Sequence, residues 1–267
     1  MKKERVNKVV VITGSSSGIG LATSKLLISK GYIVYGIARN LDKEGITKYV
    51  CDVTDEDKIN HIFNEIFEKE GRIDYLINNA GIGISGAIEH TSNADIDKIF
   101  NINIIAPIKL SRNVIPFMRK NNFGRIINIS SIASVIPLPF QACYSATKAS
   151  IQNFSSALNN EVKDFNIRVT SILPGDTKTG FTDARIKNKI LEDENYKKRI
   201  NTSISKMEKD ERKGKDPITV SKVIYKVMKR KNPPISVAVG FEYKLVVFLA
   251  RILPQKWLNN IIKKIYG

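Results

Sequence analysis

The chain has 267 residues, 42% of them hydrophobic, which is enough for one large α/β domain with a substantial core. Its two cysteines lack metal-ligand spacing and its histidines number two, which excludes a disulfide framework and a histidine-rich metal site, so no metal is expected. The net charge of +17 is uneven: residues 1–181 contain 22 Lys and Arg against 17 Asp and Glu, and residues 182–267 contain 21 against 9.

The basic last third of the chain has two interpretations. It could form a surface for nucleic acid or anionic lipid, or its lysines could lie on solvated faces. Neither a nucleic-acid-binding motif nor interleaved aromatic residues accompany the charge, so solvated faces are favoured and no nucleic acid is expected as a partner. The charged opening at 1–5 is followed by no apolar signal core, which predicts a cytoplasmic protein.

Strand-like and helix-like segments alternate along the chain. Apolar runs bounded by turn residues predict strands, which cover residues 8–13, 32–37, 48–51, 73–77, 125–129, 167–172 and 235–239. Strands that alternate with helices are typical of βαβ units on a parallel sheet. The sequence therefore predicts a single Rossmann-type α/β domain over residues 1–267, doubly wound, with about seven parallel strands and helices on both faces.

The intervening helices carry recognisable start and stop signals. Thr54 is the expected N-cap of the helix before the fourth strand. A long helix is expected over about 97–120, with an interruption near Pro116, and another over 144–164. An Asp-Pro pair is typical of a helix start and predicts a helix over 216–231.

A glycine-rich turn joins the first strand to the first helix. Residues 13–20 read Thr-Gly-Ser-Ser-Ser-Gly-Ile-Gly, and a dinucleotide fold needs glycine at this turn so that backbone N–H groups can approach a pyrophosphate. A turn without a ligand is the alternative, because such a loop alone is a weak signal. The expected phosphate contacts come from Gly14, Ser16, Ser17, Gly18, Ile19 and Gly20.

Tyr144 and Lys148 are spaced for proton transfer. Residues four apart share one face of a helix, so the ammonium of Lys148 can lie close to the phenol of Tyr144. A free tyrosine has a pKa of about 10, and a fixed cation lowers that pKa toward neutrality. Ser131, 13 residues upstream of Tyr144, follows the fifth strand and supplies a hydroxyl.

Together these motifs closely resemble the short-chain dehydrogenase/reductase family, in its single-domain form with a T-G-x-x-x-G-x-G loop and a Y-x-x-x-K pair. The resemblance runs from about residue 8 to residue 180. Further matching positions are the Asn-Asn-Ala-Gly segment at 78–81, the helix residue Asn103, the Pro-Gly turn at 174–175 and Thr179.

The resemblance implies an oxidoreductase that moves a hydride between a nicotinamide and a carbonyl or secondary alcohol. In such an oxidoreductase, Tyr144 exchanges a proton with the substrate oxygen and Ser131 hydrogen-bonds that oxygen. Lys148 lowers the Tyr144 pKa and binds the nicotinamide ribose, while Asn103 holds a water that links Lys148 to solvent. The other implied cofactor contacts are Asp52, Val53, Asn79, Ala80, Gly81, Tyr144, Lys148, Pro174, Gly175, Thr177 and Thr179.

The residues at the end of the second strand bear on cofactor choice. NAD-preferring proteins place an acidic residue there to bind the adenosine ribose hydroxyls. This chain has Ala38 followed by Arg39, which removes a carboxylate that would repel a 2′-phosphate and adds a planar cation that can bind one. The sequence therefore predicts NADP(H) in preference to NAD(H).

The substrate side is less clearly marked. The resemblance implies that the segment after Pro174 closes over the substrate, so residues 176–215 are expected to form a mobile lid. Residues 241–267 are expected to be an amphipathic extension, too short in its apolar run to span a bilayer. Core or subunit packing is favoured for it, with peripheral membrane contact or a role for a hydrophobic carbonyl substrate as alternatives. Family members usually pair through two long helices, which implies a homodimer or homotetramer.

Two other functions stay open. A catalytically silent NADP(H)-binding sensor or scaffold would use the same fold, although it has no need of the Ser131, Tyr144 and Lys148 set. A nucleic-acid-binding protein would use the basic last third and would not depend on Tyr144.

Overall fold

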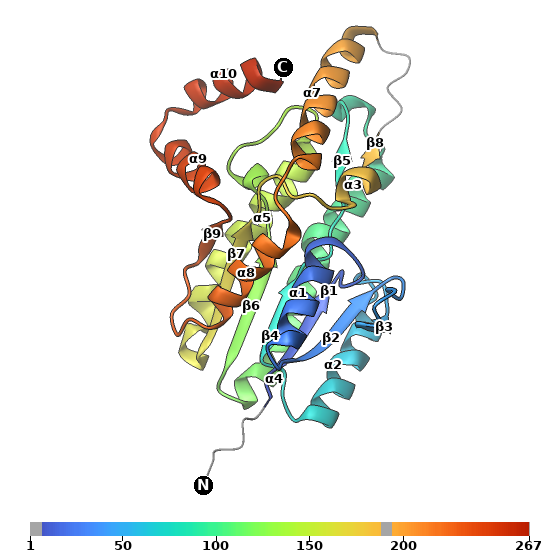
Figure 1. Ribbon diagram of the computed structural model, residues 1–267, viewed down its shortest axis with the longest axis vertical. Coiled ribbons are helices and arrows are strands. Elements are labelled where there is room, and N and C mark those ends of the chain that lie inside the picture. The colour runs from blue at the N-terminus through green and yellow to red at the C-terminus, as the bar shows by residue number, and fades with distance from the viewer. Residues whose placement is uncertain (1–6, 188–193, 267) are drawn as a thin grey trace.

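The computed structural model describes residues 7–187 and 194–266, in which a parallel sheet lies between two layers of helices (Figure 1). Seven strands pair in the order β3-β2-β1-β4-β6-β7-β9, and every pairing is parallel. The predicted doubly wound Rossmann fold is therefore confirmed. The strands are Val9–Thr13 (β1), Ile33–Ala38 (β2), Thr47–Val50 (β3), Tyr75–Asn78 (β4), Gly124–Ile129 (β6), Ile167–Leu173 (β7) and Ser236–Ala238 (β9).

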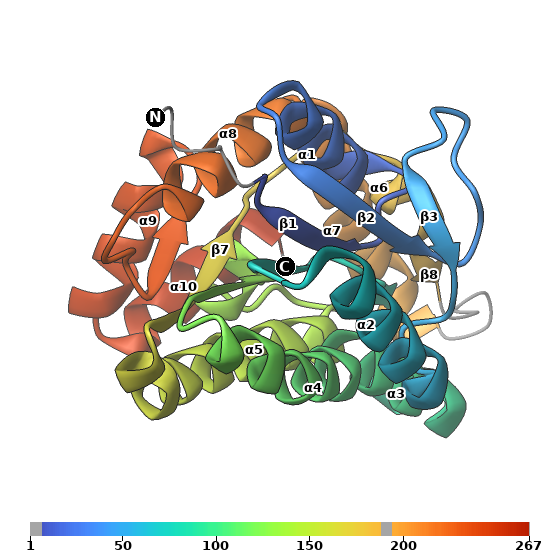
Figure 2. The ribbon, with the colours of Figure 1, turned by 90° about the horizontal axis from the view of Figure 1, so that it is seen from below.

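Helices cover both faces of the sheet (Figure 2). On one side α1 (Gly18–Ser29) packs against α8 (Pro217–Met228). The other side carries α2 (Glu56–Glu70), α4 (Ala106–Lys120) and α5 (Ala142–Val162). Successive side chains of β1 enter the two cores in turn, which explains why its apolar run is continuous rather than alternating.

The long helix expected over 97–120 is differently divided. It consists of α3 (Asn93–Phe100), a π-helical turn η2 (Asn101–Ile105) and α4. Pro116 does not interrupt α4, so that prediction is wrong. Pro116 and Arg112 lie on the exposed side, where water can bind the Arg112 carbonyl that the proline leaves without its helical partner.

The start of α2 also differs from expectation. Asp55, not Thr54, is the N-cap, since its carboxylate accepts a hydrogen bond from the N–H of Lys58. The Thr54 hydroxyl instead donates to Asp52. Helix α8 begins as expected with Asp216 as N-cap, but it ends at Met228.

The segment expected to form a lid is largely folded. It contains α6 (Phe181–Ala184), β8 (Ile186–Lys187) and α7 (Glu194–Arg212), while residues 188–193 lie outside the described part of the chain. Strand β8 pairs with β5 (Ile84–Ser85), which attaches the segment to the opposite wall of the crevice. Four short turns complete the fold: η1 (Ile88–His90), the π-helical η2, η3 (Ile132–Ser134) and η4 (Lys163–Phe165).

The C-terminal extension forms two helices, α9 (Phe241–Ile252) and α10 (Gln255–Tyr266). Two apolar residues of α10, Leu258 and Ile262, are buried on the side toward α7. None of the residues of α9, all of which are described, is buried. Packing in the core therefore does not account for α9. No helix in residues 7–187 and 194–266 has both the length and the apolar character needed to cross a membrane.

Candidate active site

The candidate site lies at the carboxyl ends of the central strands. The glycine loop follows β1, the segment Asn79–Gly81 follows β4, and Ser131 follows β6. Because parallel strands end at one edge of the sheet, the order β1-β4-β6 brings these three loops side by side.

Two glycines of the loop are required by the backbone path. Gly14 has φ +67°, and a Cβ there would lie 2.9 Å from the Asn79 amide nitrogen. A Cβ on Gly20 would lie 2.1 Å from the main-chain oxygen of Gly14, so the first turn of α1 could not pack on the loop. Helix α1 begins at Gly18, after Ser17 as N-cap, and its free N–H groups face the loop.

The segment after β4 clamps this loop. The amide of Asn79 donates to the main-chain oxygens of Thr13 (3.0 Å) and Gly14 (3.1 Å), while the N–H groups of Asn79 and Ala80 donate to the Thr13 hydroxyl, each at 3.0 Å. These bonds occupy the Asn79 side chain. Asn79 is therefore placed to hold the loop in shape rather than to bind a ligand through its amide.

The three candidate catalytic residues, Ser131, Tyr144 and Lys148, lie close together. The ammonium of Lys148 lies 5.6 Å from the centre of the Tyr144 ring, on the same face of α5. It donates a hydrogen bond of 2.9 Å to the main-chain oxygen of Ile129, the last residue of β6. Ser131 hydrogen-bonds the Tyr144 phenol, and its oxygen also accepts the N–H of Ala133 at the start of η3.

The electrostatics of this pair differ from the expectation. Burial raises the pKa of Tyr144 to about 12, and the hydrogen bond from Ser131 opposes this rise. Burial also lowers the pKa of Lys148 from 10.5 to about 8. The prediction that Lys148 brings the tyrosine pKa toward neutrality is not met, because desolvation is the larger influence on both groups.

Asn103 occupies the π-helical turn η2 between α3 and α4. Its amide oxygen accepts the N–H of Ile82 (2.9 Å), and its amide nitrogen donates to the Ile82 carbonyl (3.0 Å) and the Thr147 hydroxyl (3.1 Å). A Cβ on Gly81 would lie 3.2 Å from the Asn103 oxygen and 3.6 Å from the Lys148 nitrogen. Asn103 and Lys148 thus flank Gly81 on the catalytic side of the crevice.

The segment after β7 runs back over the glycine loop. The side chain of Thr179 lies 3.3 Å from the position of a Cβ on Gly18. Thr177 pairs with Lys215, and its hydroxyl donates to the main-chain oxygen of Gly175, so this hydroxyl is already occupied. Pro174 accepts the N–H of Ile132 through its carbonyl, which connects this segment to the turn that carries Ser131.

Tyr243 of α9 is a site residue that the sequence did not indicate. Its hydroxyl accepts the N–H of Asp176 (2.9 Å) and donates to the Asp176 carboxylate (2.8 Å). A Cβ on Gly175 would lie 2.0 Å from the Tyr243 ring, so only glycine fits there. No local pattern indicates this contact, because Tyr243 and Asp176 are 67 residues apart in the chain.

Phe181 and Arg185 form another unpredicted part of the site. The Phe181 ring lies 5.7 Å from the Tyr144 ring, and the Arg185 guanidinium lies 5.7 Å from the centre of the Phe181 ring. Arg185 is buried and forms an ion pair with Glu211 of α7, which also accepts the Thr182 hydroxyl. These contacts fasten α6 to α7 beside the catalytic tyrosine.

A pocket of about 390 Å³ lies at the end of β2 and β3, away from Tyr144. The exposed Arg39 and the carboxylate of Asp52 both line it, whereas Val53 packs against the core. The Asp52 carboxylate accepts two hydrogen bonds from Thr54, and together with Arg39 they hold its pKa below the usual value although burial opposes this. The remaining lining residues are Thr54, Lys98, Asn101, Ile102, Ile105, Ala106 and Lys109.

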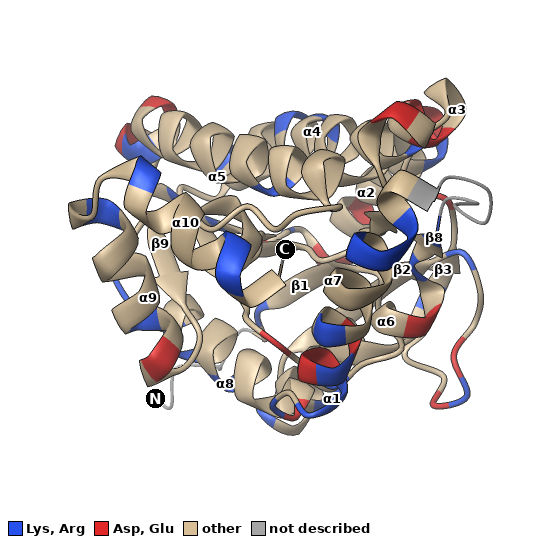
Figure 3. Ribbon diagram, turned by 90° about the horizontal axis from the view of Figure 1, so that it is seen from above, with Lys and Arg blue, Asp and Glu red and all other residues tan. Residues whose placement is uncertain are grey.

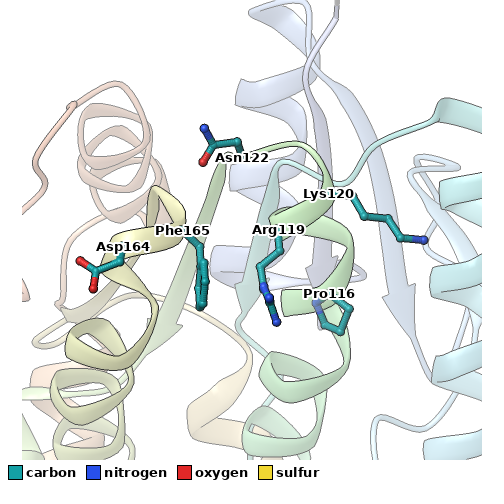
Figure 4. A pocket seen from close by; sticks show the side chains of 6 residues that line it. All are labelled: Pro116, Arg119, Lys120, Asn122, Asp164 and Phe165. Carbon is teal, nitrogen blue, oxygen red and sulfur yellow. The ribbon is translucent and has the colours of Figure 1, made fainter.

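A second pocket of about 440 Å³ is unrelated to this chemistry (Figure 4). It lies at the carboxyl end of α4, near the start of β6 and so at the opposite edge of the sheet. Its lining residues include Arg119, whose guanidinium lies 4.3 Å from the centre of the Phe165 ring.

The residues present fit a nicotinamide dinucleotide. Two glycines with positive φ, Gly14 and Gly18, let the loop backbone turn tightly at a helix N-terminus, which is where a pyrophosphate binds. A dinucleotide that spans this crevice would have the Arg39 pocket near its adenosine and Tyr144 with Lys148 near its nicotinamide. Within residues 7–187 and 194–266, no group of three or more His, Cys, Asp or Glu side chains is arranged to hold a metal ion.

Comparison with known proteins agrees with the fold and with the family that the sequence resembles. The family model described as short chain dehydrogenase matches residues 8–190. The chain therefore belongs to the short-chain dehydrogenase/reductase family of oxidoreductases.

Among its relatives, 3-ketodihydrosphingosine reductase of Bacteroides thetaiotaomicron is 40% identical over 237 residues, which cover 87% of this chain and 88% of that protein. The solved structure of ElxO with NADP bound is 29% identical and has a TM-score of 0.73, over 90% of this chain and 99% of that one. NAD⁺-bound xylitol dehydrogenase is 25% identical with a TM-score of 0.73, over 88% and 98%. The family and its nucleotide-binding fold are thus shared with proteins that bind either cofactor.

Proposed function

We propose that the chain is an NADP(H)-dependent reductase of a carbonyl group on a long-chain, apolar substrate, of which 3-ketodihydrosphingosine is the favoured example. The observation that carries the catalytic part is the Tyr144 phenol, which lies beside Ser131 and beside the buried Lys148. The substrate class is supported by the 40% identical relative, whose name gives 3-ketodihydrosphingosine as its substrate.

The state of the tyrosine favours the reductive direction. A phenol whose pKa is raised to about 12 is protonated at neutral pH and can donate its proton to a carbonyl oxygen that gains charge. Ser131 donates a second hydrogen bond to the same oxygen and orients it. The nicotinamide, when bound, supplies the hydride.

Lys148 and Asn103 have supporting roles in this proposal. The Lys148 ammonium has two further N–H donors beyond the one bound to Ile129, and these would hold the nicotinamide ribose hydroxyls. Asn103 positions Ile82 and Thr147 around Gly81, which keeps the ribose side of the crevice open.

The adenosine end supports NADP(H). Arg39 is exposed beside the pocket after β2, where a 2′-phosphate would lie, and Ala38 supplies no competing carboxylate. Lys98 and Lys109 add positive charge to the same pocket. The Asp52 carboxylate accepts hydrogen bonds from Thr54 and also lines this pocket, where it would contact the adenine amine.

Replacing Tyr144 by phenylalanine tests the catalytic proposal. Tyr144→Phe removes only the proton donor, so we expect NADPH oxidation with 3-ketodihydrosphingosine to fall by a factor of about 10² or more, with the NADPH dissociation constant within about twofold of wild type. The measurement is NADPH absorbance against a panel that also contains a short-chain ketone and a 3-oxoacyl thioester.

Tyr225→Phe is the matched control, because it removes a phenol at α8, in the core on the other side of the sheet. It should leave turnover unchanged. A non-catalytic sensor or scaffold would bind NADPH yet oxidise it with no member of the panel, and turnover that survives Tyr144→Phe would refute the assigned role.

We propose that residues 176–215 act as a lid over the substrate.

We also propose that the chain assembles as a homodimer or homotetramer through the outer faces of α4 and α5. Family members often oligomerise, and the two long helices lie side by side on one face (Figure 2). Light scattering on the full chain tests the assembly: a monomer at micromolar concentration would contradict it.

A further inference from the structure

Helix α9 exposes an apolar stripe. Five of its apolar side chains recur at spacings of three, four and seven residues, so they share one face of the helix. Phe241 is 82% exposed, and the other members of the stripe are Leu245, Phe248, Leu249 and Ile252, which are 49%, 58%, 37% and 61% exposed. The opposite face, through Tyr243, is attached to Asp176, so the stripe points away from the molecule.

Helix α10 adds a second exposed stripe. Trp257, Ile261 and Ile265 lie four residues apart and are 62%, 47% and 50% exposed. The buried residues Leu258 and Ile262 lie on the adjoining face, which packs toward α7. Helix α10 therefore has one apolar side that is covered and a second that is not, while α9 has an apolar stripe and no buried residue. Large exposed apolar patches mark interaction surfaces.

The charges around the two stripes are positive. Residues 241–267 contain five Lys and Arg and one acidic residue. That acidic residue, Glu242, forms an ion pair with Lys215. Five cations remain in this segment, Lys244, Arg251, Lys256, Lys263 and Lys264 (Figure 3), and by helical spacing Lys244, Arg251 and Lys264 lie beside the stripes.

The stripes lie close to the catalytic crevice. Figure 1 shows α7 and α10 at the end of the molecule opposite the N-terminus, and the parallel strands run toward that end. Tyr243 connects α9 directly to Asp176, the residue that follows the Pro-Gly turn after β7. A partner bound to these helices would therefore lie beside the mouth of the site.

We infer that α9 and α10 form a docking surface for an anionic lipid bilayer. Apolar side chains flanked by lysine and arginine match an interface in which acyl chains lie beneath negative headgroups. A second copy of this chain fits less well, because a symmetric contact would bring the same cations of two molecules together. The inference stands on the surface alone and does not depend on the substrate proposed above.

Trp257 provides a direct assay, since it is the one tryptophan of the chain and belongs to the α10 stripe. We expect the full-length protein to bind vesicles of phosphatidylcholine with phosphatidylglycerol, with a blue shift of Trp257 emission and quenching by brominated lipid. Binding to pure phosphatidylcholine vesicles should be at least tenfold weaker, and high salt should weaken binding to the anionic vesicles.

Two pairs of variants separate the apolar and electrostatic contributions. Leu245→Ser with Phe248→Ser should weaken vesicle binding by about a hundredfold, since two large side chains no longer enter the apolar layer. Lys244→Gln with Lys264→Gln should weaken it by about 25-fold, at roughly fivefold for each lysine. The matched controls are Leu41→Ser, an exposed apolar residue after β2, and Lys30→Gln with Lys58→Gln, exposed cations on α1 and α2.

The controls should bind vesicles as wild type does, and all variants should keep the wild-type far-ultraviolet circular dichroism. Absence of vesicle binding at every composition would overturn the inference, as would equal losses in the stripe and control variants. A change of molecular mass by light scattering in Leu245→Ser with Phe248→Ser would identify the stripe as a subunit contact instead. A Trp257 shift with duplex DNA and none with vesicles would assign the surface to nucleic acid.

Discussion

Burial governs both ionisable members of the catalytic pair, although it acts on them in opposite directions. It disfavours the phenolate of Tyr144 and the ammonium of Lys148, so each neutral form is favoured relative to the free amino acid. The result is a protonated phenol next to a lysine whose pKa is about 8. Such a lysine can change charge within the working range of the enzyme, which an exposed lysine cannot.

The lowered lysine pKa makes a prediction about stability and pH. Between about pH 8 and 10.5 the unfolded chain holds a proton on Lys148 that the folded protein has lost, so this group adds stability as the pH rises through that window. Below pH 8 the cost of burying the charge is present in full. At 1.36 kcal/mol per pKa unit, the stability gained across this pH window is about 3 kcal/mol.

We therefore expect the stability of wild type relative to Lys148→Met to improve by about 3 kcal/mol between pH 7 and pH 10.5. Urea unfolding of both proteins at the two pH values measures it. Lys58→Met, at an exposed position of α2, should show no such pH dependence. A Lys148→Met difference that is equal at both pH values would contradict the assigned cause.

At the scale of the element, the segment between β7 and α8 is attached to its surroundings at several points. Strand β8 pairs with β5, the N–H of Ile186 donates to Gly83, and Lys215 donates to the carbonyl of Asp176. The buried ion pair between Arg185 and Glu211 joins α6 to α7 behind Phe181. This ion pair fixes α6, and with it the Phe181 ring that lies beside Tyr144.

Breaking this pair should be costly. Arg185→Met leaves the Glu211 carboxylate with the Thr182 hydroxyl in a largely buried place, and we expect a loss of about 3–5 kcal/mol in the free energy of unfolding. Arg212→Met is the matched control, because Arg212 pairs with Asp183 and both side chains are exposed. It should have no measurable effect.

The double variant Arg185→Met with Glu211→Leu should recover most of the lost stability, since two apolar side chains leave no buried charge. Urea unfolding measures all three variants. Equal losses in Arg185→Met and Arg212→Met would mean that burial does not distinguish the two pairs.

At the scale of the whole molecule, cofactor binding couples to the stability of the fold. The crevice is built from loops after β1, β2, β4, β6 and β7, so a ligand that spans it connects elements from most of the chain. A ligand at 100 times its dissociation constant adds about 2.7 kcal/mol to the free energy of unfolding.

We expect NADPH to raise the melting temperature more than NADH does at the same concentration. Arg39→Glu should remove this excess and weaken NADPH binding by at least tenfold, because it places a carboxylate beside the 2′-phosphate. Calorimetric titration and thermal unfolding with each cofactor measure both effects, and Lys69→Glu, exposed in the last turn of α2, is the charge control. Equal dissociation constants for NADH and NADPH in the wild type would refute the preference.

Much of this molecule could be predicted from local sequence. Each strand of the large sheet was placed to within about two residues, because a buried parallel strand requires a continuous apolar run between turn residues. The proximity of Tyr144 and Lys148 follows from helical periodicity alone. The helix boundaries were less certain, since Thr54 and Asp55 are both good N-caps and only the hydrogen bond to Lys58 distinguishes them.

The fold, the glycine loop and the proximity of Tyr144 and Lys148 could be read from the chain alone, because they depend on short-range spacing and on the alternation of strands and helices. The partners of Asp176 and Arg185 and the exposure of α9 required the three-dimensional structure, since each depends on residues that are distant in the chain. That structure also decided the direction of the Tyr144 pKa. Desolvation depends on how much of the molecule surrounds a group, and no local pattern contains that information.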